Sequence, residues 1–309
     1  MRKRLLPIVL AVAFVLLAIA PLFLSGYWIR VLTGVFTMAI VAQGINVVLG
    51  FAGYLAMGNV VFFGTGAYVT GVLMVRLDVP FIVSLAAAVL LCGLYAFILG
   101  LPILRLKGGY FTIATIGVNQ ATKEIITNLP FTGGGHGLGL PIILLEPEIV
   151  FGLFYYAFLG VMVLSTLLVW AIDRSRFGYA LLAIRDGEEA AKVMGIDTTR
   201  NKVAAWSISA MLTGLAGGMY AYYISYLEPI SVFDITFSVR SVIMTLLGGI
   251  GTVLGPILGA GTLEIVTELV WSRFLNFHLM ATGLVIILAV RLLPKGLPSL
   301  FTRRKGGRA

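Results

Sequence analysis

The sequence predicts an all-α polytopic membrane protein with about ten transmembrane helices. Only 11% of the 309 residues are charged, and the mean hydropathy is +1.04. Soluble domains carry about 25% charged residues, so this chain cannot cover a water-exposed surface. The apolar residues form long continuous runs without the alternation of a barrel strand, and this favours helices over a β-barrel.

The predicted helices follow the apolar runs in order. They span residues 5–24, 29–49, 58–75, 80–104, 109–127, 149–172, 203–225, 236–250, 255–271 and 277–293. The first run follows a basic start, as a signal peptide would. At about 20 residues it is long enough to cross a bilayer core of about 30 Å, so we interpret it as an uncleaved first span. The eighth and ninth runs are short and rich in glycine, and broken or re-entrant helices are an open alternative there.

The distribution of basic residues predicts the topology. Most of the 22 Lys and Arg residues fall at the N-terminus, in the 105–107 turn, in the 173–202 loop and in the C-terminal tail. Cytoplasmic loops are enriched in Lys and Arg, and these four regions are separated by even numbers of predicted helices. Both termini and the 173–202 loop are therefore expected in the cytoplasm, and the 128–148 loop outside.

The composition also argues against several functions. The chain is predicted to be one transmembrane domain, residues 1–309, with one cysteine and two histidines, so no metal and no other cofactor is expected. Its net charge of +9 fits cytoplasmic loops better than nucleic acid, because no basic stripe interleaved with aromatic residues is present. No phosphate-binding glycine loop and no catalytic constellation appears. We therefore expect neither ATP binding by this chain nor an enzyme.

A charged segment, Arg185–Lys202, stands in the middle of this apolar chain, with eight charges in 18 residues. Asp186 as N-cap and Glu189 three residues later have the spacing of a capping box, and Gly195 stands where a left-handed C-cap is common. The segment therefore predicts a short helix over 187–194.

Three apolar residues of this short helix, Ala190, Val193 and Met194, share one face. Two interpretations are open, since a two-turn helix is marginal alone in water. The helix rests on the lipid headgroups or its own bundle, or it docks into a groove of a cytoplasmic partner.

These residues carry a resemblance to a known family. The run Glu189-Ala190-Ala191-Lys192-Val193-Met194-Gly195 resembles the coupling-loop motif of ABC importer permeases. The segments that resemble branched-chain amino acid permeases, of the LivM type, are NVVLGFAGYLAMG (46–58), LRLKGGYFTIATIGVNQ (104–120), TGGGHG (132–137), the run 175–221, LLGGIGTVLGPILGA (246–260) and RLLPKGL (291–297).

The resemblance implies a fold of about ten helices, similar to the vitamin-B12-type ABC importer permeases, in the inner membrane. It implies two cytoplasmic ABC ATPase subunits, a second permease of the LivH type and an extracytoplasmic solute-binding protein as partners. It also implies import of branched-chain or similar hydrophobic amino acids. The residues expected to couple the permease to the ATPases are Asp186, Glu189, Ala190, Ala191 and Gly195.

Two glycine-rich segments share an L-G-x-x-G spacing, with Gly50 and Gly53 in one and Gly248 and Gly251 in the other. The recurrence fits an internal duplication whose interface carries the translocation path, which would then be lined by Asn46 and these four glycines. It also fits small residues that simply let membrane helices pack closely.

Two acidic residues in the ninth run, Glu264 and Glu268, would each cost roughly 2.5–3.5 kcal/mol at the bilayer centre. They are expected near a membrane surface, or facing a substrate ammonium group or a partner subunit. The remaining functional alternatives are an ABC permease for a sugar, urea or a short amide, and an ion-gradient-driven secondary carrier.

Overall fold

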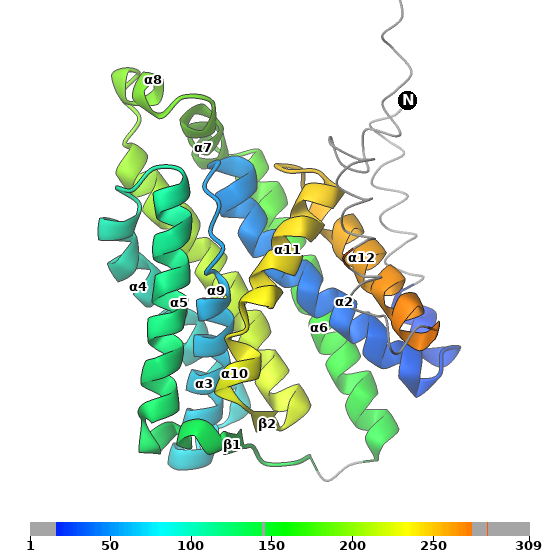
Figure 1. Ribbon diagram of the computed structural model, residues 1–309. Coiled ribbons are helices and arrows are strands. Elements are labelled where there is room, and N and C mark those ends of the chain that lie inside the picture. Colours follow the sequence, from blue (N-terminus) through cyan, green and yellow to red (C-terminus); the bar gives the residue numbers. More distant parts are fainter. Residues whose placement is uncertain (1–16, 144–145, 274–282, 284–309) are drawn as a thin grey trace, which may run out of the picture.

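The long helices of the molecule follow the apolar runs of the sequence. The computed structural model describes residues 17–143, 146–273 and 283 (Figure 1). The long helices are α2 (Gly26–Ile45), α3 (Val60–Leu77), α4 (Phe81–Ile103), α5 (Gly109–Asn128), α6 (Pro147–Asp173), α9 (Thr198–Ile224), α11 (Ile235–Gly248) and α12 (Gly255–Arg273). The shorter elements are the 3-10 turns η1 (Ala20–Leu22), η3 (Pro130–Thr132) and η4 (Gly134–His136), the π-helical turn η2 (Asn46–Phe51) that extends α2, and helices α7 (Arg176–Asp186), α8 (Glu188–Val193) and α10 (Pro229–Val232).

The predicted helices from 29–49 to 255–271 each correspond to a helix, while most of 5–24 and nearly all of 277–293 lie outside the described residues. Six segments of the described chain are long and apolar enough to cross a membrane: Gly26–Phe51, Val60–Leu77, Phe81–Ile103, Pro147–Asp173, Thr198–Ile224 and Pro229–Gly248. The chain is therefore a polytopic helical membrane protein. The number ten stays a prediction.

The eighth predicted span, 236–250, corresponds to one short helix, α11, which a break at 233–234 separates from α10. Helix α11 has 14 residues, which rise about 21 Å and fall short of a bilayer core of about 30 Å. The short helix α10 precedes it and extends the apolar segment. After α11 the chain turns back into α12 through Gly249 and Gly251, whose φ angles of 109° and 70° suit glycine.

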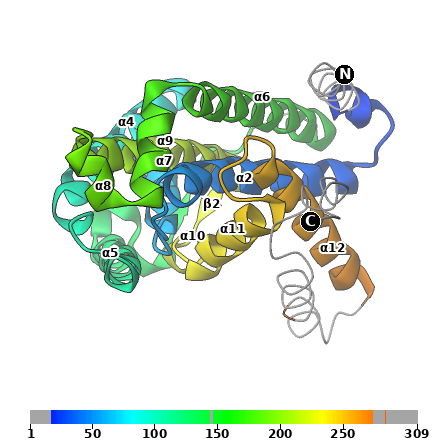
Figure 2. The same ribbon diagram turned by 90° about the horizontal axis from the view of Figure 1, so that it is seen from above.

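Helices α2 and α9 are the centre of the bundle. Helix α9 packs against α3, α4 and α2, while α2 also packs against α6, α11 and α12. Seen from above, α2 runs between α6 on one side and α11 on the other (Figure 2). In contrast, α4 leaves a row of large apolar side chains exposed, as a lipid-facing helix does: Ile82, Val83, Leu90, Leu91, Leu94, Phe97, Ile98 and Leu101.

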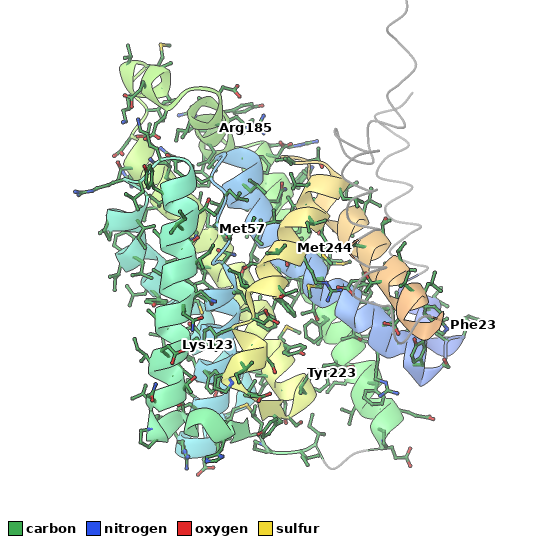
Figure 3. The ribbon with its side chains drawn as sticks, viewed as in Figure 1. Phe23, Met57, Lys123, Arg185, Tyr223 and Met244 are labelled. Carbon is green, nitrogen blue, oxygen red and sulfur yellow. The ribbon has the colours of Figure 1, made fainter. Side chains whose placement is uncertain are left out.

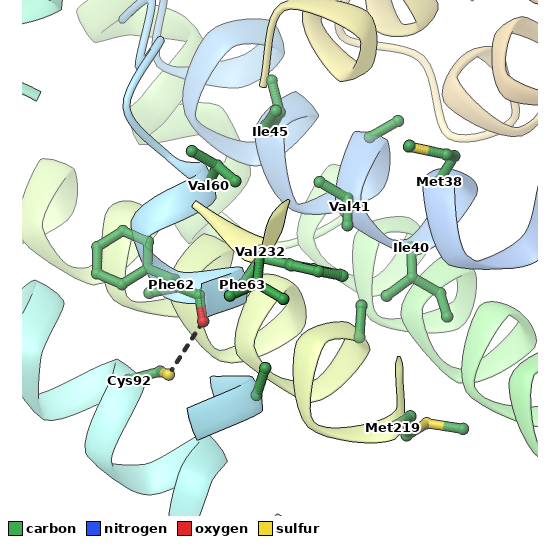
Figure 4. Packing of buried hydrophobic residues seen from close by; sticks show 14 of the residues in the cluster. Met38, Ile40, Val41, Ile45, Val60, Phe62, Phe63, Cys92, Met219 and Val232 are labelled. Atoms are coloured by element: carbon green, nitrogen blue, oxygen red, sulfur yellow. Dashed lines mark hydrogen bonds between the residues drawn. The ribbon is translucent and has the colours of Figure 1, made fainter. Parts of the chain in front are cut away.

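Glycines allow α3 and α9 to approach closely. A Cβ at Gly66 would overlap the backbone of Gly214, and a Cβ at Gly217 would overlap the carbonyl of Phe63. Membrane helices associate through such small residues, because lipid gives little hydrophobic drive for helices to pair. Around this crossing Phe62 and Cys92 are buried, and the Cys92 thiol donates to the Phe62 carbonyl at 3.4 Å (Figure 4).

Residues 52–59 form a non-helical linker inside the bundle. The linker leaves the end of α2 beside α7 and reaches the start of α3 deeper in the molecule (Figure 1). Helix α5 supplies two partners for its backbone, since Thr112 Oγ1 donates to the Leu55 carbonyl at 2.9 Å and Gly58 N donates to Thr115 Oγ1 at 3.1 Å. Irregular backbone at membrane depth requires such internal partners.

The opposite end of the molecule carries a small two-stranded sheet. Strand β1 (Leu138–Gly139) pairs antiparallel with β2 (Tyr226–Leu227), with Leu138 opposite Leu227. The Tyr226 hydroxyl donates to the His136 carbonyl at 2.6 Å. The sheet thereby joins the 128–148 loop to the end of α9, far from α8 (Figure 1).

Candidate functional site

Helix α7 supports the charged segment and was not predicted from the sequence. Ser175 caps it, because its Oγ accepts a hydrogen bond from Gly178 N at 3.0 Å. Leu181 and Ile184 are buried against a second apolar cluster that includes Ile172. Helix α7 thus holds α8 at the end of the bundle, where Arg185 lies, on the far side of the molecule from Lys123 (Figure 3).

The predicted helix over 187–194 exists as α8, Glu188–Val193, but its predicted capping box is wrong. Gly187 occupies the N-cap position and no side chain caps the helix. Asp186 instead ends α7 and pairs with Arg185 Nε at 3.8 Å. Because Asp186 is already helical, it lacks the extended backbone that an N-cap needs, and Glu189 bonds to Lys107 instead.

The predicted left-handed cap at Gly195 is confirmed. Its φ is 83°, Gly195 N donates to the Lys192 carbonyl at 3.0 Å, and Ile196 N donates to the Ala191 carbonyl at 3.0 Å. These two bonds are the Schellman motif that closes a helix C-terminus. No other group lies within 4 Å of a Cβ placed at Gly195, so only backbone conformation requires glycine there.

Replacing Gly195 with alanine is expected to destabilise the last turn of α8 by about 1–2 kcal/mol, the cost of a left-handed L-residue. Amide hydrogen exchange of residues 190–196 should become roughly tenfold faster, since 1.4 kcal/mol is a factor of ten. Gly187→Ala is the matched control, because Gly187 has an extended φ of 178° and its Cβ would meet only Ala190, at 3.7 Å. Equal exchange in the two variants would contradict this explanation.

The outer face of α8 is apolar and uncovered by the described residues. Val193 is 87% and Met194 is 81% exposed, and Ala190 is exposed beside them. Ala191 is on the opposite side and is buried with the apolar cluster under α7. The face of Ala190, Val193 and Met194 therefore does not rest on the part of the bundle that the structure describes.

Glu188 is the more buried of the two acids of α8, with a side chain that is 14% exposed against 71% for Glu189, and sequence reasoning missed it. Lys202 Nζ donates to Glu188 Oε1 at 2.7 Å, and the Tyr54 hydroxyl donates to Oε2 at 2.6 Å. Burial alone would raise the pKa of Glu188, but the hydrogen bonds from Lys202 and Tyr54 outweigh it and lower this pKa to about 2. The carboxylate therefore stays ionised at neutral pH.

Glu189, unlike Glu188, lies on the surface. Lys107 Nζ donates to Glu189 Oε1 at 2.7 Å, and this hydrogen bond lowers the pKa of Glu189. Both side chains are more than 60% exposed. Exposed ion pairs are screened by water and salt, so this pair adds little to the attachment of α8.

The two glycine-rich segments meet in the structure. Asn46 joins them, since its Nδ2 donates to the Thr252 carbonyl at 3.0 Å and its Oδ1 accepts from Gly251 N at 2.9 Å. A Cβ at Gly50 would lie 2.7 Å from Gly251 N, and Arg185 Nη1 donates to the Gly50 carbonyl at 2.6 Å. Close packing of small residues is thus present, at the α7 end of the bundle.

Of the remaining two glycines of the predicted path, Gly53 belongs to the same contact and Gly248 does not. A Cβ at Gly53 would lie 2.8 Å from Arg185 Cγ. Gly248 lies between α11 and α12, where a Cβ would overlap the Gly255 carbonyl. The structure therefore groups Asn46, Gly50, Gly53 and Gly251 around Arg185 and leaves Gly248 in the neighbouring hairpin.

Glu264 has a partner that the sequence did not indicate. Arg240 Nη2 of α11 donates to Glu264 Oε1 of α12 at 2.9 Å, and both side chains are largely buried. Glu268, one turn further, accepts a hydrogen bond from the Tyr27 hydroxyl. Pairing within the chain thus satisfies Glu264 inside the bundle, and a surface position is not needed to explain it.

Comparisons with known proteins agree with the observed architecture. A sequence model of the family described as "Branched-chain amino acid transport system / permease component" matches residues 27–290. The chain is similar to the high-affinity branched-chain amino acid transport system permease protein LivM of Escherichia coli (strain K12), with 29% identity over 93% of this chain and 73% of that protein.

Relatives with other names match a shorter part. The ribose import permease protein RbsC of Bacillus subtilis is 30% identical over 59% of this chain and 58% of that protein. The autoinducer 2 import system permease protein LsrC of Klebsiella pneumoniae is 31% identical over 55% of this chain and 50% of that protein. No solved structure matches the chain.

Proposed function

This chain belongs to the branched-chain amino acid permease family, of the LivM type, and from this premise we propose that it is the membrane-spanning subunit of an ATP-driven importer of branched-chain or similar hydrophobic amino acids. The proposed partners are two cytoplasmic ABC ATPase subunits, a second permease of the LivH type and an extracytoplasmic solute-binding protein. The proposed fold has about ten transmembrane helices, similar to the vitamin-B12-type permeases.

The observation that carries the proposal is the uncovered apolar face of α8. Val193 and Met194 are almost fully exposed, and α8 lies at one end of the bundle (Figure 1). Amphipathic helices with such a face dock into grooves of partner proteins. Each ATPase subunit is proposed to bind one such helix in a groove. When ATP binding closes the two ATPases together, the bound helix moves with them.

Five residues have proposed roles in this attachment. Asp186 and Glu189 present charge around the apolar face, and Ala190 leaves room for the partner surface. Ala191 lets α8 pack closely on α7, and Gly195 ends the helix sharply. The proposal places residues 173–202 in the cytoplasm with both termini, and residues 128–148 outside. The separation of α8 from the β1–β2 sheet supports this (Figure 1).

The translocation path is proposed to pass beside the glycine contact. Asn46, Gly50, Gly53, Gly248 and Gly251 border this path in the proposal, and the contact of Gly50 with Gly251 closes it at the cytoplasmic end. The hydrogen bonds of Asn46 to Gly251 and Thr252 support this closing role. A ligand can open such a contact only by binding one state more tightly than the other.

Reconstituted uptake tests the proposal. The chain is assembled with its ATPases, second permease and binding protein in vesicles, and labelled leucine uptake is followed. Uptake is expected to require ATP on the side of the ATPases and to persist when ionophores remove the proton and sodium gradients. Uptake that ignores ATP and stops with the ionophore would instead establish an ion-gradient-driven carrier.

Sugars are the second candidate cargo, favoured by the similarity to the ribose import permease. The family match over residues 27–290 and the greater coverage of the LivM relative favour amino acids. Competition distinguishes them. Excess unlabelled isoleucine or valine should suppress leucine uptake, while excess ribose should not. Urea and short amides are tested as competitors in the same assay.

A further inference from the structure

A buried lysine lies where α8, α9 and the 52–59 linker meet. Lys202 is 4% exposed, and its ammonium group donates to Glu188 Oε1 at 2.7 Å, to the Leu104 carbonyl at 3.0 Å and to the Tyr54 hydroxyl at 3.0 Å. All three of its donors are therefore used. The same ammonium lies 4.9 Å from the centre of the Tyr54 ring.

This position is costly for a lysine. The ammonium is withdrawn from water, and it belongs to the second turn of α9, near the positive end of the helix dipole. Such a charge is tolerated only with close partners, and here the partners come from separate elements. Glu188 is in α8, Leu104 directly follows α4, and Tyr54 is in the linker.

Glu188 completes the connection from the other side. One carboxylate oxygen accepts from Lys202 and from Thr198 Oγ1, at 3.3 Å, and the other accepts from Tyr54. The linker is held a second time by Arg185 of α7, which donates to the Gly50 carbonyl just before it. The linker region is thus bound twice: Arg185 of α7 bonds to Gly50 just before it, and Glu188 of α8 bonds to Tyr54 within it.

The surroundings of α8 show why a fastening is needed. Gly187 and Gly195 flank the helix, and glycine is the most flexible hinge residue. The small side chain of Ala191 is buried under α7, and the network of Glu188 adds the polar contact that keeps α8 from pivoting between these two glycines when a partner pushes on it. The exposed Lys107–Glu189 pair is too weakly held to prevent that pivot.

We propose that Lys202 is a positioning residue that locks α8 to the 52–59 linker, so that a displacement of α8 moves this linker inside the bundle. This role rests on the proposed function, and it specifies how a movement of α8 reaches the interior of the permease. The hydrogen-bond network of Glu188, Lys202 and Tyr54 connects α8 to the linker. The linker, which also bonds to α5, is the element that moves.

The test compares transport per ATP in vesicles carrying the full complex. In the double variant Lys202→Met with Glu188→Met, no unpaired charge stays buried, and such apolar replacements of an ion pair often preserve stability. The ATPases should still bind and hydrolyse ATP, but the amino acid molecules imported per ATP should fall by about fivefold or more, the lower range of allosteric coupling. Tyr54→Phe should reduce the same ratio more weakly.

Lys107→Met is the matched control, since it removes an exposed lysine of the same ion-pair cluster. Its import per ATP should equal that of the wild type. A second readout is amide hydrogen exchange of residues 52–59, which should respond to ATP in the wild type and not in the double variant. A purely structural role of Lys202 would instead lower the yield and the melting temperature together, with an unchanged ratio for the complexes that form.

The outcomes separate this inference from the proposed function. A wild-type complex without ATP-driven uptake contradicts the proposed function. ATP-driven uptake in the wild type, combined with an unchanged ratio in the double variant, contradicts the role of Lys202 alone.

Discussion

Replacing Val193 and Met194 together with aspartate is expected to abolish ATP-driven uptake and leave the permease folded. Both side chains are more than 80% exposed, so the permease itself loses no packing. A partner groove that buries them gains about 1.5–3 kcal/mol per side chain, and two carboxylates in that groove would also be desolvated at further cost. We expect the affinity for the ATPase subunits to fall at least about a hundredfold, since 2.8 kcal/mol corresponds to that factor.

Co-purification of the ATPase subunits and leucine uptake measure this effect. The matched control is Val193→Ile with Met194→Leu, which keeps the face apolar and should retain both binding and uptake. The melting temperature of the isolated permease should be the same in all three proteins. Full ATPase binding by the aspartate variant would show that α8 is not the docking helix.

Gly217→Leu should cause a large loss of stability at the contact between α3 and α9. Any Cβ at Gly217 would overlap the backbone of Phe63, so α9 would have to move away from α3. Overpacking typically costs about 1–3 kcal/mol, and here the obstructing group is backbone that cannot change its rotamer. We expect a cost at or above the upper end of this range.

Thermal unfolding of the purified permease in detergent is the measurement. Gly160→Leu serves as the control, because Gly160 is exposed on α6 and no group lies within 4 Å of its Cβ. It should leave the melting temperature near that of the wild type. If both variants melted alike, the close contact of α3 with α9 would not limit stability.

The helices were predictable because apolar runs long enough to cross a membrane leave few alternatives. Gly195 was predictable for a local reason, since its left-handed cap depends on neighbouring residues only. Helix α7 was missed because charged residues at both of its ends made residues 173–202 look like one charged loop. Its buried face is short and is formed by Leu181 and Ile184. A search for helical periodicity in the loop would have found them.

Contacts between distant segments were beyond the reach of the sequence. The motif pointed to Glu189, whereas the more enclosed acid is Glu188. Its partners Tyr54 and Lys202 lie on other elements. Arg240 likewise finds Glu264 only through the α11–α12 hairpin. The repeated L-G-x-x-G spacing suggested that the two glycine-rich segments are related by duplication or pack closely. Only the structure shows that Asn46 hydrogen-bonds one segment to the other.

Helix α9 is one uninterrupted helix of 27 residues, about 40 Å long. Its first turns bind Glu188 on one surface, and its last turn leads into the strand that pairs with β1 on the other. In the proposed topology, this single helix connects the side of the membrane that carries α8 with the side that carries the β1–β2 sheet. If binding of a partner to the sheet changes the contact between α9 and α8, linkage requires that a partner bound to α8 changes the affinity at the sheet by the same free energy.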